Sequence, residues 1–314
     1  MKKLAAFAFA SLFAATAAAQ SVSIITTPVG SFSNSAGAAM AKALVDKAKL
    51  RAVVQAQAST GFEETVSGQA DFNVSNSFDA TFFATGTGEY EGRGAHKNLR
   101  YVGALIPYRV AMHVRADSDI KRIADLKGKR VSSGFQSQKT IGRIIEAYLG
   151  TAGLSYDDVQ KVPTPNVVRQ ADDFMSNKTD VMFFALGSAA IKQANASVGG
   201  VRVLEVEDSP EVLTRLQKAL PGAYILTVNP APNIEGISKP TKLVAFDMVM
   251  VVRAELGDDI VYKTAKALYE SKPELQATFP PFGLFNPKNM AKPLQSVPMH
   301  PGAAKFYKEV GLIK

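Results

Sequence analysis

Residues 133–140 bring hydroxyl and amide side chains together in a pattern that could hold a small anion. A short strand-like run precedes them, and an apolar helical pattern follows, formed by Ile141, Ile144, Ile145, Tyr148 and Leu149. A helix that begins at a strand's carboxyl end directs unpaired N–H groups and its positive dipole end at the ligand, so no buried cation is needed. The candidate donors are Ser133, Gln136, Ser137, Gln138 and Thr140. Ser137 or a neighbour could instead serve only as a helix N-cap.

A second turn of the same kind lies near the start of the chain, between a β-rich run at 22–26 and an Ala-rich helical run at 35–48. Two further strand-like runs, at 51–58 and 72–75, also end in hydroxyl or amide residues. The candidates on this half of the chain are Ser31, Ser33, Asn34, Ser59, Thr60, Ser75, Asn76 and Ser77. Thr60 and Glu63 also have capping-box spacing, so a structural role for Thr60 is an open alternative. Together the turns predict two halves of a clamp for a carboxylate-bearing ligand.

Four more residues are candidates because of their places in the chain. Tyr108 and Arg109 follow Pro107 between two predicted strands, and Phe184 lies in the apolar run at 180–185. Asp247 is the one acidic residue in the apolar run at 241–252. Arg109 could equally be a surface arginine, and Asp247 could form a structural ion pair or occupy a strand edge.

The elements that must position these side chains alternate between strands and helices, which predicts an α/β fold with mostly parallel sheets covered by helices. About 295 residues would remain after removal of a leader, more than one core usually supports, so two lobes are expected. The strand runs near 110–116 and 243–252 are the expected crossovers and hinges. The predicted division is lobe I at 20–113 plus 246–314 and lobe II at 114–245.

Residues 1–19 have the pattern of a secretory signal peptide, with Lys2 and Lys3, an apolar run and small residues ending at Ala19. The apolar run is shorter than the roughly 20 residues of a membrane span. The chain has no cysteine, so neither disulfides nor a lipid-modified cysteine can form. A periplasmic, monomeric protein is therefore expected. Loss of Lys2 and Lys3 lowers the formal net charge from +8 by two, and the absence of a basic run makes nucleic acid a poor partner.

The composition disfavours a secreted enzyme. No Gly-x-Ser-x-Gly motif is present, and the chain's 3 histidines are His96, His113 and His300, at spacings that suggest neither a catalytic pair nor a metal site. We expect no cofactor, no metal and no catalytic residue.

Several segments resemble one family of transport receptors. They are residues 114–118 (VRADS), 124–131 (ADLKGKRV), 154–159 (LSYDDV) and 300–307 (HPGAAKFY). Over most of its length the chain is similar to TAXI proteins, the solute-binding receptors of TRAP transporters, and the last segment is the most specific. The ADLKGKRV segment is common to many two-lobed, type II-like periplasmic binding proteins.

The resemblance implies two α/β lobes joined by two crossover strands, with a small organic acid or amino acid held between them and delivered to TRAP membrane subunits. Two departures weaken the expectation of a glutamate-like ligand. Residues 30–34 replace a Gly-rich loop with paired tyrosines, and Tyr108 and Arg109 stand where many members have an acidic residue. The same fold could serve an ABC permease or a sensor kinase.

Cleavage after Ala19 is the first testable expectation. The exported protein should have the mass of residues 20–314, because the small residues before Gln20 fit the signal peptidase. Mass spectrometry of the periplasmic protein measures this directly, and a mass that includes residues 1–19 would contradict it.

Overall fold

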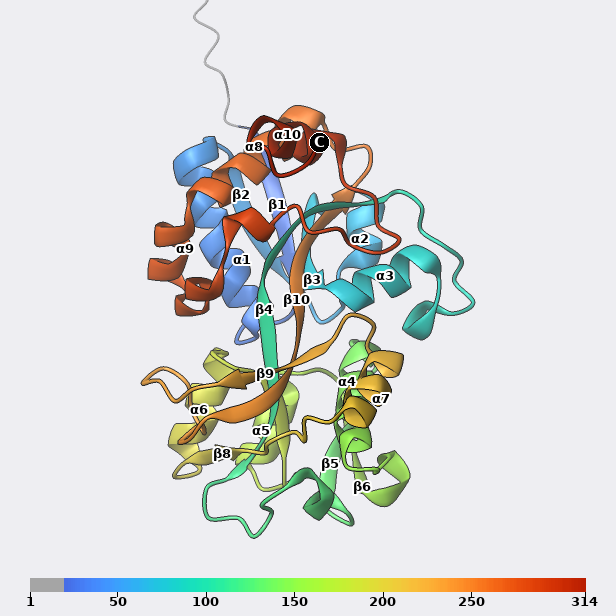
Figure 1. The fold of residues 1–314 in the computed structure, drawn as a ribbon, viewed down its shortest axis with the longest axis vertical. Coiled ribbons are helices and arrows are strands. Elements are labelled where there is room, and N and C mark those ends of the chain that lie inside the picture. The colour runs from blue at the N-terminus through green and yellow to red at the C-terminus, as the bar shows by residue number, and fades with distance from the viewer. Residues whose placement is uncertain (1–19) are drawn as a thin grey trace, which may run out of the picture.

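The structure is a computed structural model that describes residues 20–314, so the predicted signal peptide lies outside the described residues. Two lobes are stacked along the long axis, and two long strands run through both of them (Figure 1). These are β4 (Leu99–Arg115) and β10 (Thr241–Arg253), which pair antiparallel from Val110 opposite Val244 to Leu99 opposite Arg253. The α/β class with two lobes is confirmed.

Lobe I is built on one half of this strand pair. Its sheet adds β1 (Ser21–Thr26), β2 (Arg51–Ala56) and β3 (Phe72–Asn76) in the order β2-β1-β3-β10-β4. Strands β1, β2 and β3 are parallel to one another, as expected. Side chains of β10 alternate between two cores: Met248 and Met250 pack in the core that includes α1, and Val249 and Val251 pack with α2 and α3.

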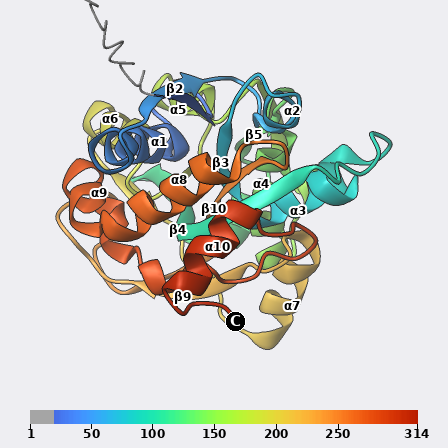
Figure 2. The same cartoon turned by 90° about the horizontal axis from the view of Figure 1, so that it is seen from above.

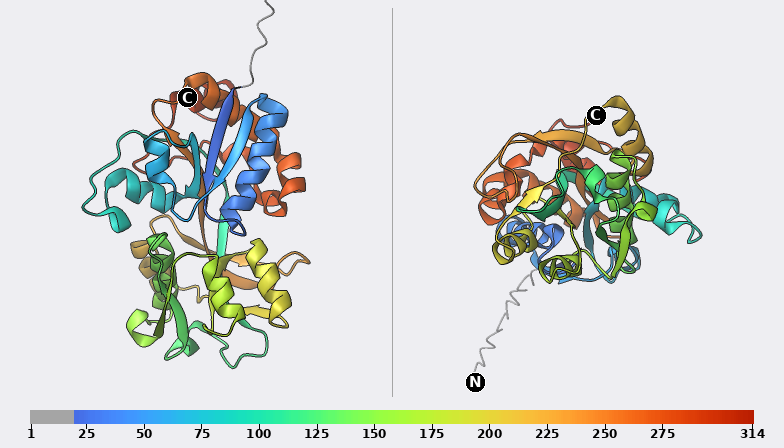
Figure 3. Two further views of the ribbon diagram at one scale, coloured as in Figure 1. Left: turned by 180° about the vertical axis from the view of Figure 1, so that it is seen from behind. Right: turned by 90° about the horizontal axis from the view of Figure 1, so that it is seen from below.

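Helices cover both faces of the lobe I sheet, as the views from above and behind show (Figures 2 and 3). One group consists of α1 (Phe32–Ala43), continued by a π-helical turn (Leu44–Ala48), α8 (Asp258–Glu270), α9 (Lys272–Thr278) and α10 (Pro301–Glu309). The other consists of α2 (Phe62–Val66) and α3 (Ser77–Thr85), followed by a 3₁₀ turn (Gly88–Tyr90).

The 300–307 segment singled out in the sequence has a structural role at the start of α10. The Nδ1 atom of His300 accepts a hydrogen bond from Gly302 N at 3.2 Å, and Pro301 occupies the first helical turn. A Cβ atom at Gly302 would lie 2.2 Å from Asp258 O, so only glycine allows α10 to pack so closely on α8.

Lobe II contains β5 (Arg130–Gly134), β6 (Gln160–Thr164), β7 (Met182–Ala185), β8 (Val201–Val203) and β9 (Tyr224–Val228). Its helices are α4 (Lys139–Thr151), α5 (Arg169–Met175), α6 (Ala189–Ser197) and α7 (Pro210–Ala219). The expectation of a mostly parallel sheet is wrong for much of this lobe. Strands β5 and β6 form a parallel pair, but β7 and β8 pair antiparallel with β4, and β9 pairs antiparallel with β10. The reason is that these strands assemble on the ends of the two crossing strands.

One continuous strand, β4, replaces the two strands expected on either side of residues 107–109. Pro107 lies opposite Asp247, beside a shift in the β4–β10 register. Proline cannot donate a ladder hydrogen bond and is tolerated in strands where pairing is irregular. The strand therefore continues through Pro107 because β4 itself is bulged beside this residue, where its pairing with β10 is irregular.

Tyr148 of α4 links lobe II to both long strands. Its hydroxyl donates to Val110 O and accepts from Val244 N at 3.2 Å, and the side chain is fully buried. The side chain thus ties the helix that carries Gln138 and Thr140 to the strands that cross between the lobes.

Replacement of Tyr148 by Phe should lower the free energy of unfolding by about 1–3 kcal/mol, because two buried backbone groups lose a hydrogen-bond partner. Urea unfolding followed by circular dichroism measures the change. Tyr262→Phe is the matched control, since its hydroxyl bonds Glu309 at the surface and its loss should cost less than about 0.5 kcal/mol. Equal losses in the two variants would contradict the role assigned to Tyr148.

Candidate functional site between the lobes

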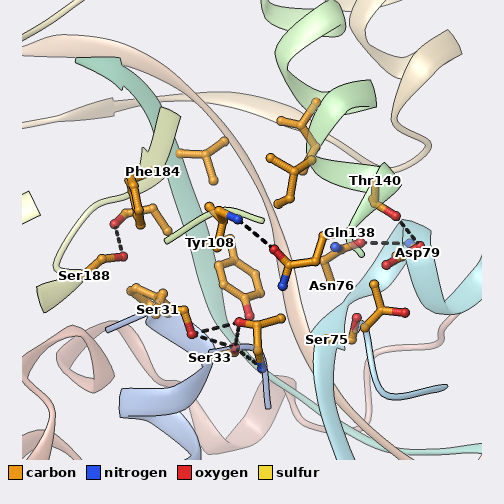
Figure 4. A pocket seen from close by; sticks show the side chains of 18 of the residues that line it. Ser31, Ser33, Ser75, Asn76, Asp79, Tyr108, Gln138, Thr140, Phe184 and Ser188 are labelled. Atoms are coloured by element: carbon orange, nitrogen blue, oxygen red, sulfur yellow. Dashed lines mark hydrogen bonds between the residues drawn. The ribbon is translucent and has the colours of Figure 1, made fainter. Parts of the chain in front are cut away.

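A partly open cavity of about 90 Å³ lies where the lobes meet. Its lining comes from both lobes (Figure 4). The polar residues that line it are Thr27, Ser31, Ser33, Thr60, Ser75, Asn76, Asp79, Gln138, Thr140 and Ser188. The aromatic and aliphatic residues are Phe32, Val74, Tyr108, Val110, Ile141, Ile144, Val167, Phe183, Phe184, Ala185 and Phe246. No Lys, Arg or His from residues 20–314 contributes to this lining.

The turn after β1 supplies a cluster of three hydroxyls. The Oγ1 atom of Thr27 lies 2.8 Å from Ser31 Oγ and 2.5 Å from Ser33 Oγ. Ser31 is the N-cap of α1 and accepts a hydrogen bond from Asn34 N at 3.2 Å. Gly30, with φ of 92°, lets the turn reverse after Pro28. Ser31 therefore caps α1 and also lines the cavity, so a capping role does not exclude ligand binding.

The end of β3 leads into α3 at the opposite side of the cavity. Asn76 is the N-cap of α3, and its Oδ1 accepts from Asp79 N at 2.8 Å. This cap fixes the first helical turn, which places the Asp79 carboxylate at the cavity wall. Thr140 of lobe II donates its hydroxyl to Asp79 Oδ1 at 2.8 Å, so this hydrogen bond joins the lobes.

Gln138 lines the cavity from lobe II, as Thr140 and Ser188 do. Its Oε1 atom accepts a hydrogen bond from Val167 N at 2.9 Å, which leaves the Nε2 group as the free donor end. Within the described part of the chain Nε2 has no hydrogen-bond partner, although Gln138 is only 2% exposed. Figure 4 shows the amide among Tyr108, Asn76 and the hydroxyls of the first turn. A buried amide donor without a partner predicts an acceptor in the cavity.

Four helices begin at the cavity. The N-cap residues are Ser31 of α1, Asn76 of α3, Gln138 of α4 and Ser188 of α6, and all four line the cavity. Helix N-termini carry partial positive charge and unpaired N–H groups. Their convergence favours an acidic group on the ligand, without any cationic side chain.

Aromatic side chains form much of the remaining wall. Tyr108 packs against Phe32 at a ring-centroid distance of 5.1 Å and against Phe246 at 5.6 Å. Phe184 adds a fourth ring, from the end of β7. These apolar walls exclude water and fit the carbon skeleton of a small solute.

Asp79 is 1% exposed, and burial raises the pKa of its carboxyl to about 7. Hydrogen bonds from the hydroxyls of Thr140 and Tyr90 act in the opposite direction but do not outweigh the loss of solvent. The carboxyl therefore changes charge close to neutral pH.

Some predicted site residues lie outside this cavity. Ser59, Gln136 and Ser137 line a wider pocket of about 480 Å³, which also includes Thr60 and Thr140 and so adjoins the cavity. Ser77 and Asp247 line a separate pocket of about 150 Å³. Asp247 pairs there with Lys292 and accepts a hydrogen bond from the Tyr224 hydroxyl at 3.3 Å, which is the structural ion pair considered above.

Three further candidates line none of these pockets. Asn34 donates from Nδ2 to Thr26 Oγ1 at 3.1 Å, and Ser133 is buried within β5. Arg109 neighbours Tyr108 on β4, where successive side chains point to opposite faces, and burial lowers the pKa of its guanidinium. Nor do Thr60 and Ser137 act as N-caps: α2 is capped by Gly61 and α4 by Gln138.

Sequence reasoning missed Thr27, Phe32, Asp79, Ser188 and Phe246. For Asp79 a local signal exists, because Asn76 three residues earlier is a good N-cap and places Asp79 in the first turn of a helix. Ser188 follows the apolar run of β7 in the same way.

Residues 20–314 contain no group of three or more His, Asp or Glu side chains suited to a metal ion. None of the helices described combines the length and apolar character needed to cross a bilayer.

Comparison with known proteins places the chain in a family and a fold. A family model described as the NMT1-like family matches residues 24–311. The structure is similar to the alkanesulfonate-binding protein SsuA from Xanthomonas axonopodis pv. citri bound to MOPS, with a TM-score of 0.52, 15% identity and coverage of 95% of this chain and 96% of that one. For the aliphatic sulphonate binding protein SsuA from Escherichia coli the TM-score is 0.50 at 16% identity, with 95% of each chain covered. For the periplasmic binding protein BugD the TM-score is 0.59 at 14% identity, with 93% of this chain and 98% of that one covered. At such identities the similarity shows the fold, which is that of two-lobed periplasmic binding proteins.

Asp79→Asn should stabilise the ligand-free protein above neutral pH. In the unfolded chain the Asp79 carboxyl loses its proton near pH 3.8, whereas in the folded protein it retains the proton to about pH 7. Asp79 therefore lowers the free energy of unfolding progressively as the pH rises from 3.8 to 7. We expect the variant to gain about 2–4 kcal/mol at pH 8 and progressively less towards pH 5.

Urea unfolding at several pH values measures this gain. Asp71→Asn is the control, because Asp71 is paired with Arg253 at 3.3 Å away from the cavity and its loss should give no gain. A stability difference between Asp79→Asn and the native protein that does not change with pH would contradict the assignment.

Proposed function

Since the chain belongs to the NMT1-like family, we propose that it is a periplasmic solute-binding protein that captures a small carboxylate-bearing solute between its two lobes. The observation that carries this proposal is the buried Nε2 donor of Gln138, which has no hydrogen-bond partner among residues 20–314 and lines a cavity at the convergence of four helix N-termini. Neutral donors of this kind bind an acid group in a dry site. The solute is an organic anion or an amino acid.

The size of the cavity limits the solute. A volume of about 90 Å³ is smaller than the roughly 150 Å³ of a cavity that accepts benzene. The solute therefore has few heavy atoms, with an acid group near Gln138 and the first-turn hydroxyls and an apolar part against the aromatic walls.

Binding is proposed to close the lobes about β4 and β10, with lobe I at 20–113 plus 246–314 and lobe II at 114–245. Phe246 and Asp247 lie between the part of β10 that pairs with β9 and the part that pairs with β3. On β4, pairing with β7 begins at Val110. Closure lets a membrane partner distinguish loaded from empty receptor.

The membrane partner proposed is a TRAP-type transporter, with the chain as a monomeric, exported receptor of the TAXI group. The segments at 114–118, 124–131 and 300–307 support this choice. An ABC permease is the second candidate, favoured by the fold shared with a ligand-binding component of an ABC-type import system from Staphylococcus aureus at a TM-score of 0.53. The transporter genes beside this one would distinguish the two.

A thermal-shift screen of small carboxylates, sulfonates and amino acids should identify ligands, because a solute at about 100 times its Kd adds roughly 2.7 kcal/mol to stability. For the best carboxylate, Gln138→Leu should weaken binding about ten- to a hundredfold, the value of one hydrogen bond to a charged group. Calorimetry measures the affinity, and small-angle scattering with saturating ligand should show a more compact protein.

Ser137→Ala is the matched control, since Ser137 lines the outer pocket rather than the cavity and its loss should leave the affinity within about twofold. If Gln138→Leu binds as tightly as the native protein, the cavity is not the solute site.

A further inference from the structure

Asp79 is a buried acid that forms no salt bridge with any cationic side chain of residues 20–314. The groups next to it are the hydroxyl of Thr140 at 2.8 Å and the hydroxyl of Tyr90, which itself hydrogen-bonds the hydroxyl of Thr60 at 3.1 Å. Two charged groups lie near, Glu89 and Arg143, but they pair with each other at 2.6 Å. Arg143 also lies over the Phe82 ring, 5.1 Å from its centroid. The charge of Arg143 is thus paired with Glu89, and Arg143 does not line the cavity.

A carboxylate removed from water is costly unless a cation or a proton neutralises it. Hydroxyl donors such as Thr140 reduce this cost for the ionised form, but they supply no opposite charge. Because no Lys, Arg or His lines the cavity within residues 20–314, the matching charge must come from the ligand or from a bound proton.

The groups suited to an acid lie on a different side of the cavity. In Figure 4 Asp79 and Thr140 are on one side, and Ser31, Ser33 and Ser188 are on the other. The aromatic rings of Phe32, Tyr108 and Phe246 pack together in the wall that also lines the cavity. The cavity is therefore polarised, with one acidic side, one donor-rich side and an apolar wall.

On the premise that this cavity is the solute site, we infer that Asp79 is the specificity-determining residue and that the preferred solute is a small zwitterion. Its ammonium group binds Asp79, and its acid group binds Gln138 and the hydroxyls of the first turn. A dicarboxylate is disfavoured, because its second carboxylate would meet Asp79 and no cationic side chain. Within the proposed solutes, this selects compact amino acids over hydroxy acids of the same size.

The test compares pairs of probes that differ only in an ammonium or a hydroxyl group: L-alanine with L-lactate, and 2-aminobutyrate with 2-hydroxybutyrate. Calorimetry at pH 8 should give at least tenfold tighter binding of the amino acid in each pair. Asp79→Asn should remove this preference by lowering the affinity for the amino acid, whereas Asp71→Asn should retain the preference. Circular dichroism establishes that both variants are folded.

The pH profile provides a second readout. With Asp79 ionised in the complex, the affinity of the native protein for the amino acid should fall as pH decreases from 8 to 6, and that of Asp79→Asn should not. Glu89, Arg143 and Tyr90 face Asp79 from the neighbouring elements, and Arg143→Gln tests whether the pair of Arg143 with Glu89 contributes to the profile.

The outcomes separate the two proposals. Hydroxy acids that bind as tightly as their amino acid partners, with binding weakened by Gln138→Leu, would overturn the role of Asp79 and leave solute binding in this cavity intact. Failure of every carboxylate to bind at millimolar concentration would overturn both.

Discussion

The antiparallel pairing of β4 with β10 is the constraint on which the remaining structure depends. These two strands extend through both lobes, and the other strands of the large sheet are added to their ends: β3 and β9 to β10, and β7 and β8 to β4. Their side chains also alternate between cores, so the same pairing decides which residues are buried against which helices. A change of register by one residue would replace Tyr108 by Arg109 at the cavity.

The cavity is a consequence of this architecture. Strands β1, β3, β5 and β7 all run towards the meeting line of the lobes and end there in polar turns, after which α1, α3, α4 and α6 begin. Each turn brings a helix N-terminus and at least one hydroxyl or amide group to the same volume. The acid-binding character proposed for the cavity would thus follow from where the strands end, and no charged side chain would be required to produce it.

Local patterns were sufficient to predict the strand–turn–helix units, because apolar periodicity and polar turns are short-range signals. They located Ser31, Ser33, Asn76, Gln138 and Thr140, all of which line the cavity. They could not decide between Tyr108 and Arg109, since that choice depends on the face of a strand. Nor could they show the contact of Asp79 with Thr140 or of Asp247 with Lys292, because these partners are distant in sequence. The antiparallel additions to β4 and β10 were missed for the same reason.

Pro107 has a mechanical consequence for the connection between the lobes. It has no N–H group, and it lies beside the bulge of β4 where the ladder changes register. A rotation of one lobe against the other at this level therefore strains few main-chain hydrogen bonds, whereas the same rotation elsewhere along the paired strands would break several. In the proposed closure, the rotation would concentrate at this one point of the strand pair, and the regular pairing on both sides would keep each lobe rigid.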